Sequence, residues 1–172
     1  AHVRHLGPQI AEFTFDLATR EGAPAIADFR PGQYAVLELE PGLRRCYSMA
    51  NLPGTGQVQF IAKHYDGRPG STQLFSLTPG TTLSLELPYG DMWLRDRDRP
   101  ALLIAGGTGI SAILSLLRSI SGNPAWSSRP VHVLYGAATR DELVCWDELH
   151  DLTRESPTVN VHGALVSAEE SW

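Results

Sequence analysis

The sequence is poor in the residue types that build metal clusters and membrane spans. Only two of its 172 residues are cysteines, Cys46 and Cys145, whereas an iron-sulfur cluster usually takes about four thiolates, and their separation fits no zinc pattern. Both are expected to be small, buried apolar side chains. No apolar run approaches the roughly 20 residues of a membrane-spanning helix, and the N-terminus lacks the charged-then-apolar layout of a signal peptide. These absences predict a cytoplasmic protein with no membrane partner.

Positive charge is also scarce. The chain has 14 lysines and arginines against 19 aspartates and glutamates, a formal net charge of -5. Because phosphate binding requires clustered lysines and arginines, this balance argues against nucleic acid as a partner, although it does not exclude a docked protein. The six histidines are scattered, and His2 and His5 have no matching carboxylate or cysteine cluster, so no metal site is expected.

Apolar residues make up 42% of the sequence, which is enough to build a core. From residue 10 to about residue 88, apolar and polar residues alternate with the period of two that is typical of half-buried strands. Proline-glycine pairs separate the alternating runs, and residues 71–77 fit a single helical turn between strands. This half of the chain therefore predicts an antiparallel six-stranded β-barrel.

After the charged segment at residues 95–99 the pattern changes. Residues 101–105 form a short continuous apolar run, as in a buried parallel strand, and then glycines and a helical apolar spacing follow. Residues 131–135 and 159–166 indicate two further strands, and Thr139 with Glu142 fits a capping box that opens a helix between them. The order predicts a Rossmann-like parallel α/β unit. We expect domains of residues 1–98 and 99–172.

Two separate motifs carry most of the information on function. The first is RCYSMAN at residues 45–51, and the second is AGGTGIS at residues 105–111. They resemble the R-x-Y-S-x-x-N and G-G-T-G-I signatures of the ferredoxin-NADP reductase-like family of flavin oxidoreductases. The resemblance implies that the barrel binds FAD, that the α/β unit binds a nicotinamide, and that electrons pass between the two.

In the first motif, the resemblance assigns roles to three side chains. Arg45 pairs with a flavin phosphate, Tyr47 packs on the isoalloxazine or ribityl side, and Ser48 hydrogen-bonds at the reactive N5 atom. The residue types suit these roles, because a planar guanidinium binds phosphate oxygens in pairs. Side chains alternate along a strand, so Arg45 and Tyr47 are expected on one face, with Ser48 at the strand end. Ser48 is thereby a candidate catalytic residue.

Two further segments are similar to the family in position. Residues 60–63 resemble the strand whose backbone meets the ribityl and phosphate region of the flavin. Residues 70–72, at the start of the short helix, resemble the pyrophosphate site, and a helix N-terminus offers unsatisfied N–H groups for such a ligand. Ser71 is equally consistent with a simple N-cap. The candidate cofactor ligands in these segments are Ile61, Ala62, Lys63, Gly70, Ser71 and Thr72.

The glycine turn follows a strand and opens a helix, so its backbone can approach a dinucleotide closely. The resemblance places Thr108 where the nicotinamide ring meets the flavin, which makes it the second candidate catalytic residue. The family commonly continues with Ala-Pro where this chain has Ser111 and Ala112, a change that removes no ligand group. Ser167 lies where the family reads the adenosine ribose, and the acidic residues 169–170 would repel a 2'-phosphate, so NADH is favoured over NADPH. The candidate nucleotide ligands are Gly107, Thr108, Gly109, Tyr135, Gly136 and Ser167.

The family's C-G-P-x-x-M segment and aromatic tail do not occur in this sequence, so we expect a C-terminally truncated nicotinamide domain. The leading hypothesis is an FAD-dependent NADH oxidoreductase, most like the reductase components of bacterial multicomponent oxygenases. It would take a hydride from NADH at flavin N5 and pass electrons singly to an iron-sulfur centre outside this chain, in a ferredoxin or another domain, to serve an oxygenase component. The alternative is a non-catalytic flavin- or nucleotide-binding module, an electron-transfer or regulatory unit that depends on a partner chain.

Overall fold

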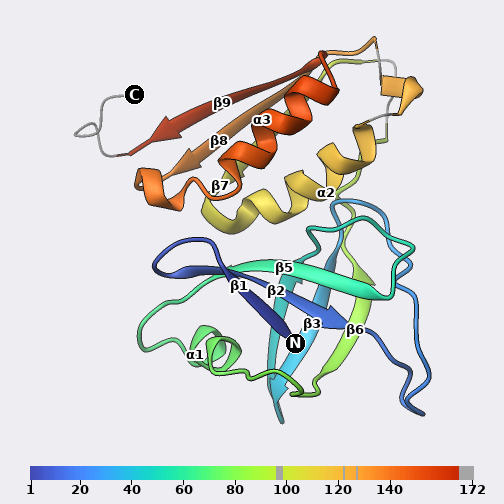
Figure 1. The fold of residues 1–172 in the computed structure, drawn as a ribbon, viewed down its shortest axis with the longest axis vertical. Helices are drawn as coiled ribbons and strands as arrows, with labels where there is room; N and C mark the ends of the chain where they lie inside the picture. The colour runs from blue at the N-terminus through green and yellow to red at the C-terminus, as the bar shows by residue number, and fades with distance from the viewer. Residues whose placement is uncertain (96–98, 122, 127, 167–172) are drawn as a thin grey trace.

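The computed structural model describes residues 1–95, 99–121, 123–126 and 128–166. Antiparallel strands form the N-terminal part of the molecule, and a parallel sheet with helices forms the C-terminal part (Figure 1). The two parts lie one above the other, and a helix of the C-terminal part packs against the strands of the first.

Six antiparallel strands make two three-stranded sheets in the N-terminal part, which we call the barrel. The strand orders are β1-β2-β5 and β4-β3-β6, and a bridge between Met49 and Phe60 joins the two sheets. The predicted six-stranded antiparallel architecture is therefore confirmed. The elements are β1 (His2–His5), β2 (Ile10–Asp16), β3 (Tyr34–Glu40), β4 (Leu43–Ser48), β5 (Gln57–Lys63), α1 (Pro69–Phe75) and β6 (Ser84–Tyr89).

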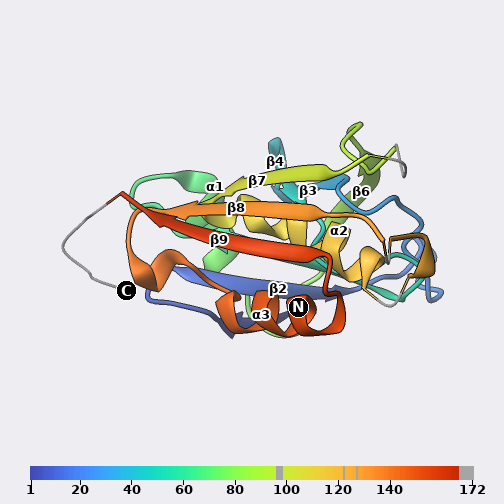
Figure 2. The same ribbon diagram turned by 90° about the horizontal axis from the view of Figure 1, so that it is seen from above.

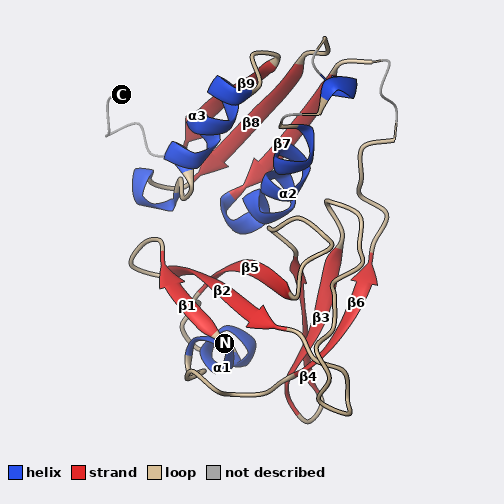
Figure 3. Cartoon of the chain, turned by 45° about the vertical axis from the view of Figure 1, so that its right-hand side comes forward, coloured by secondary structure: helices blue, strands red, loops and turns tan. Residues whose placement is uncertain are grey.

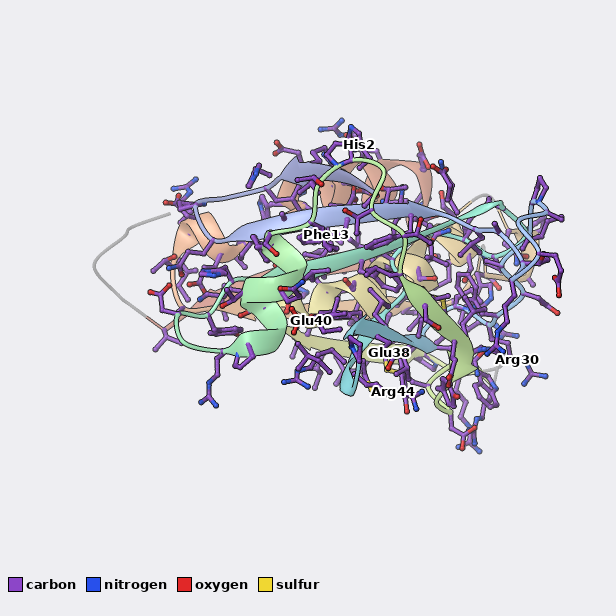
Figure 4. All side chains as sticks on the ribbon, turned by 90° about the horizontal axis from the view of Figure 1, so that it is seen from below. His2, Phe13, Arg30, Glu38, Glu40 and Arg44 are labelled. Atoms are coloured by element: carbon purple, nitrogen blue, oxygen red, sulfur yellow. The ribbon has the colours of Figure 1, made fainter. Side chains whose placement is uncertain are left out.

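The period-two alternation of the sequence explains how these sheets enclose a core. In β3, Ala35, Leu37 and Leu39 are buried, whereas the residues between them are only partly buried. Phe13 of β2 lies beside α1 (Figure 4), and its ring centroid is 5.1 Å from that of Phe75. Full burial of a side chain of this kind stabilises the fold by about 1.5–3 kcal/mol, so the inward-facing residues hold the two sheets together.

Three parallel strands in the order β7-β8-β9 form the sheet of the C-terminal part. Helices α2 and α3 lie on the same face of this sheet (Figure 2). The predicted Rossmann-like order of strands and helices is therefore confirmed. The elements are β7 (Ala101–Gly106), η1 (Gly107–Gly109), α2 (Ile110–Ile120), η2 (Pro124–Trp126), β8 (Val131–Ala137), η3 (Arg140–Glu142), α3 (Trp146–Glu155) and β9 (Val159–Leu165).

The other face of the parallel sheet is open, which corrects one expectation. The apolar run at residues 101–105 predicted a strand buried on both faces. Instead Leu102 and Ile104 are 60% and 68% exposed, while Leu103 and Ala105 point into the core. The reason is that α2 and α3 pack on one side, and none of the other described residues forms a layer over the alternate side chains of β7.

The helix before β9 begins later than predicted. Thr139 makes no side-chain capping bond, residues 140–142 form only a short 3-10 turn, and Cys145 adopts a left-handed φ of 61° before α3 starts at Trp146. Glu142 is the other member of the predicted capping box, but its carboxylate pairs with Lys63 of the barrel at 2.5 Å. The capping-box prediction was wrong because a tertiary contact takes the carboxylate that the local motif requires.

Helix α2 is the element that joins the two parts (Figure 3). Nine of its eleven residues are buried. Around it a single apolar cluster contains Ile10 and Ile61 from the barrel together with Leu103 and Val133 from the parallel sheet. None of the helices in the described ranges is long and apolar enough to cross a membrane.

The two cysteines differ from the expectation that both are buried. Cys46 is exposed and Cys145 is half-buried, and both thiols are free. Cys46 lies opposite Val36 in the register of β3 and β4. That register places it between Arg45 and Tyr47 and on the other face of β4, away from the core.

Candidate functional site

A cleft of about 510 Å³ lies where β4, β5 and α1 of the barrel meet the glycine turn of the parallel sheet. It brings together ten of the residues selected from the sequence. Thr72, Gly107, Tyr135 and Gly136 do not line it, and Ser167 lies outside the described residues. The selected residues that line the cleft are Arg45, Tyr47, Ser48, Ile61, Ala62, Lys63, Gly70, Ser71, Thr108 and Gly109.

Strand β4 supplies one wall of the cleft. Arg45 and Tyr47 are in register with Leu37 and Ala35, whose side chains face the core, so both point to that side of the sheet as the alternation predicts. The Tyr47 ring lies 6.0 Å from the ring of Phe60 between centroids. Burial raises the pKa of Tyr47, with a smaller opposing effect of Arg45. The wall therefore offers a neutral, flat phenol beside a guanidinium.

Arg45 lies across the backbone of Gly70. A Cβ atom at residue 70 would be 2.4 Å from Arg45 Nε, so glycine is what allows the guanidinium to reach this place. Arg45 Nη1 donates to the carbonyl of Arg44 at 2.8 Å. Among the described residues Arg45 has no carboxylate partner, which leaves its charge available to an anionic ligand.

Ser71 holds a loop and does not cap the short helix. The N-cap position of α1 is Arg68, and it has no side-chain capping bond. Ser71 Oγ accepts from the amide of Tyr65 at 3.0 Å and lies 3.1 Å from the carbonyls of Tyr65 and Arg68. The hydroxyl thus fixes the rim of the cleft, and the simple N-cap reading is wrong.

Ser48 and Thr108 reach the cleft from the two parts of the molecule. Ser48 ends β4, opposite Tyr34, and Thr108 lies in the short turn after β7. Within the part of the chain that the structure describes, neither hydroxyl bonds to the protein, so both are available to a ligand. Beside Thr108, Gly107 has a left-handed φ of 50° and a Cβ there would meet nothing within 4 Å. The turn is therefore open toward solvent.

Lys63 and Tyr135 behave differently from a simple ligand. The Lys63 ammonium pairs with Glu142 at 2.5 Å while its side chain also lines the cleft. Tyr135 is fully buried, and its hydroxyl donates to the carbonyl of Glu142 at 3.1 Å. Burial raises the pKa of Tyr135. Its side chain belongs to the core, so only the backbone of this residue could meet a nucleotide.

Five residues that line the cleft were not selected from the sequence: Cys46, Tyr65, Arg68, Pro69 and Ser111. Arg68 and Tyr65 stand in a loop before α1, where no motif marks them. Ser111 Oγ accepts a hydrogen bond from the buried amide of Ile61 at 3.0 Å. The available signal for Ser111 was a polar residue at the position where the family commonly has alanine.

The cleft's features fit a flavin dinucleotide. The glycine at residue 70 leaves room for a guanidinium that has no protein carboxylate, and a flat aromatic side chain and an unused hydroxyl follow on the same strand. Its volume of about 510 Å³ lies within the range of small-molecule sites.

Family comparisons agree with this geometry. Residues 2–93 match the model of an oxidoreductase FAD-binding domain, and residues 103–172 match that of an oxidoreductase NAD-binding domain.

Curated relatives are electron-transfer components of oxygenases. The chain is 31% identical to the toluate 1,2-dioxygenase electron transfer component of Pseudomonas putida, over 95% of this chain and 49% of the relative. It is 36% identical to the anthranilate 1,2-dioxygenase electron transfer component of Acinetobacter baylyi, over 84% of this chain and 43% of the relative. The chain thus spans about half the length of the curated relatives it matches, or less.

Solved structures share the fold. The ferredoxin reductase in carbazole 1,9a-dioxygenase is 26% identical with a TM-score of 0.77, over 99% of this chain and 50% of that one. The cytochrome b5 reductase domain of Ulva prolifera nitrate reductase has a TM-score of 0.80 at 19% identity, over 99% of this chain and 73% of that one. With FAD-binding and NAD-binding domains matched along its length, the chain belongs to the ferredoxin-NADP reductase-like family of flavin oxidoreductases.

Proposed function

We propose that this chain is the flavin- and nicotinamide-binding part of a reductase that passes electrons from NADH to an iron-sulfur acceptor. The observation that carries the proposal is the shared cleft, where Arg45, Tyr47 and Ser48 of the barrel face Thr108 of the glycine turn. A ferredoxin or an iron-sulfur domain outside this chain is the proposed acceptor, with an oxygenase as the final consumer. The similarity to electron transfer components of dioxygenases supports this class of partner.

For the flavin, Arg45 is the proposed phosphate ligand, and its planar fork suits paired phosphate oxygens. The backbone of residues 70–72 would bind the pyrophosphate, and Ile61, Ala62 and Lys63 would line the ribityl region. Tyr47 would pack on the ring system, and the Ser48 hydroxyl would hydrogen-bond at its reactive edge. When bound, the flavin supplies the exchange between a two-electron hydride and single electrons.

For the nicotinamide, the glycine turn supplies close backbone approach, and Thr108 would orient the ring against the flavin. Gly107, Gly109 and the backbone of residues 135–136 would bind the rest of the dinucleotide, with Ser167 at the ribose. The protein contributes orientation, so no acid-base residue is required. The preference for NADH stays a prediction, because it depends on residues 167–170, which lie outside the described part.

We place the domain boundary near residue 98, so that residues 1–98 and 99–172 form the two domains. The family matches, which end at residue 93 and begin at residue 103, support this division. A cytoplasmic location is proposed as well, and the two free thiols support a reduced compartment.

A second candidate is a non-catalytic flavin- or nucleotide-binding module, an electron-transfer or regulatory unit that depends on a partner chain. The open face of the parallel sheet favours it, since Leu102 and Ile104 are 60% and 68% exposed there. Apolar side chains that are exposed side by side commonly mark an interaction surface.

Anaerobic mixing with NADH tests the proposal. The chain is first loaded with FAD and its visible absorbance is recorded. Loss of flavin absorbance on mixing with NADH is expected for a reductase. Retained FAD with no bleaching would favour the module, and a chain that binds neither FAD nor NADH would contradict both candidates.

A further inference from the structure

Two buried serines of α2 bond to backbone groups of the barrel. Ser111 is 1% exposed, and its Oγ accepts from the amide of Ile61 at 3.0 Å. Ser115 is fully buried, and its Oγ donates to the carbonyl of Asn51 at 2.7 Å. Residues four apart lie on one face of a helix. This face of α2 therefore forms hydrogen bonds with one backbone amide and one backbone carbonyl of the barrel.

One turn further along the same face, Arg118 adds a third contact. Its Nη1 donates to the carbonyl of Ala50 at 2.7 Å. The same guanidinium bonds to Glu148 of α3, at 2.8 Å from Nε and 2.5 Å from Nη2. The side chains of Arg118 and Glu148 are 22% and 32% exposed, so the pair is shielded from much of the solvent. Helix α3 thus holds the guanidinium in place against the barrel.

These contacts hold the segment that directly follows Ser48. The amide of Ala50 donates to the carbonyl of Gln59 at 2.8 Å. The Asn51 side chain accepts from the amide of Gln59 and donates to the carbonyl of Gln57, each at 2.9 Å. Hydrogen bonds therefore fix residues 49–51 to β5. Because Ser48 directly precedes this segment, the bonds of α2 to Ala50 and Asn51 also fix the position of α2 relative to Ser48.

The N-terminus of α2 directly follows the turn that carries Thr108. Apolar contacts between helix and barrel are non-directional and would allow small sliding movements. Hydrogen bonds to fixed backbone groups are directional and define one position. The three polar contacts therefore define where Thr108 stands relative to Ser48.

We propose that Ser111, Ser115 and Arg118 are positioning residues, which set the approach of the glycine turn to the ring-binding strand. The expected effect on hydride transfer rests on the proposed function. The expected effect on the orientation of the two parts does not depend on any ligand. A misplacement on the order of 1 Å at reacting atoms can cost about a hundredfold in rate.

The test uses the chain with Ser115→Ala and Arg118→Met combined, because neither residue lines the cleft. Alanine and methionine are good helix formers, so α2 should remain helical. Ser119→Ala is the matched control, since the Ser119 hydroxyl bonds to Leu116 within its own helix at 2.7 Å. Amide residual dipolar couplings measure the orientation of the barrel relative to the parallel sheet without any cofactor. We expect the wild-type orientation in the control and a changed orientation in the double variant.

With FAD bound, the double variant should reduce its flavin at least tenfold more slowly at saturating NADH, while its Kd for FAD stays within twofold of wild type. An unchanged orientation, or a changed orientation with a wild-type reduction rate, would overturn the inference. If the double variant fails to fold, Ser115→Ala alone is measured in the same way. A wild-type chain that binds no FAD, or that NADH does not reduce, contradicts the proposed function instead, and the dipolar couplings still decide the positioning role.

Discussion

Two neighbouring arginines of β4 have different surroundings. Arg44 pairs with Glu86 at 2.6 Å, and both side chains are 50% exposed. Arg45 lies across Gly70 and lines the cleft. The strand thus carries one arginine on each face, so a charge that faces the cleft is separated from an ordinary surface ion pair.

Replacing Arg45 should selectively weaken flavin binding. We expect Arg45→Ala to raise the Kd for FAD by about 10- to 100-fold, the loss typical of a charge-assisted hydrogen bond. Arg44→Ala is the control and should leave the Kd within twofold of wild type. Titration of FAD fluorescence measures both. Equal losses in the two variants would argue against a phosphate ligand role for Arg45.

The two thiols should react at very different rates. Cys46 is exposed, whereas burial raises the pKa of Cys145 to about 11, with Glu148 as the next contributor. At pH 8 only about one in a thousand molecules would carry a Cys145 thiolate, the reactive form. We expect one thiol to react rapidly with a chromogenic disulfide and the second only after denaturant is added. Rapid reaction of both in the folded chain would contradict the buried environment of Cys145.

The same environment makes stability depend on alkaline pH. In the unfolded chain the thiol ionises near its ordinary value, whereas the folded chain holds the proton until about pH 11. The unfolded state then binds fewer protons than the folded one, so the free energy of unfolding should fall as pH rises from about 9 to 11. Urea titrations of wild type and Cys145→Ala measure the difference. If the free energy of unfolding fell equally steeply with pH in the wild type and in Cys145→Ala, other titrating groups would be responsible for the effect.

At the scale of elements, α3 shows how a local motif can fail. Thr139 and Glu142 have the spacing of a capping box, but the helix starts four residues after Glu142, beyond the left-handed Cys145. Lys63 of β5 pairs with the carboxylate of Glu142. An ion pair between the two parts of the molecule thus replaces a cap within one helix.

Thr139→Ala should therefore have little effect on stability. Loss of a true threonine N-cap typically costs about 1 kcal/mol, but we expect a change in the free energy of unfolding within about 0.5 kcal/mol, as for an ordinary surface site. Thr55→Ala is the comparison, because the Thr55 hydroxyl donates to the carbonyl of Gln57 at 3.0 Å and supports Asn51. Urea denaturation measures both variants. A loss of about 1 kcal/mol or more in Thr139→Ala would restore the capping box.

At the scale of the whole molecule, the two parts share a core. Ile10 and Ile61 of the barrel belong to the apolar cluster that surrounds α2 and the parallel sheet. The Lys63–Glu142 pair and the contacts of α2 add polar links between the same parts. The family's two domains are therefore energetically connected, despite their separate sheets.

We expect the chain to unfold in one cooperative transition. Far-ultraviolet circular dichroism reports on both parts, whereas three of the four tryptophans lie beyond residue 98, so tryptophan fluorescence reports mainly on the C-terminal part. The two signals should give coincident curves. FAD at about a hundred times its Kd should stabilise both signals by about 2.7 kcal/mol. Two separated transitions, of which FAD raises the midpoint of only one, would show that the parts unfold independently.

Much of this architecture was predictable, because the deciding patterns are local. Residues such as Leu37 and Leu39 alternate with polar neighbours, and this alternation identifies a half-buried strand without knowledge of its partners. The glycine turn between β7 and α2 follows from the motif in the same way, whereas the structure shows that Gly107 is the glycine of this turn with a positive φ. The roles of Lys63 and Tyr135 could not be assigned, since each depends on a contact with Glu142 that only the folded structure brings about: Lys63 reaches it from the barrel, and Tyr135 from the end of β8.

The sequence by itself determined the strands of the barrel, the alternation of strands and helices in the parallel unit and the family, because periodicity and short motifs act over a few neighbouring residues. Only the tertiary structure decided which face of the parallel sheet is covered, where α3 begins and what Ser115 and Arg118 do. The physical reason is that a buried serine or an arginine on a helix is defined by the group it meets. For these two residues that group is a backbone carbonyl more than sixty positions earlier in the chain.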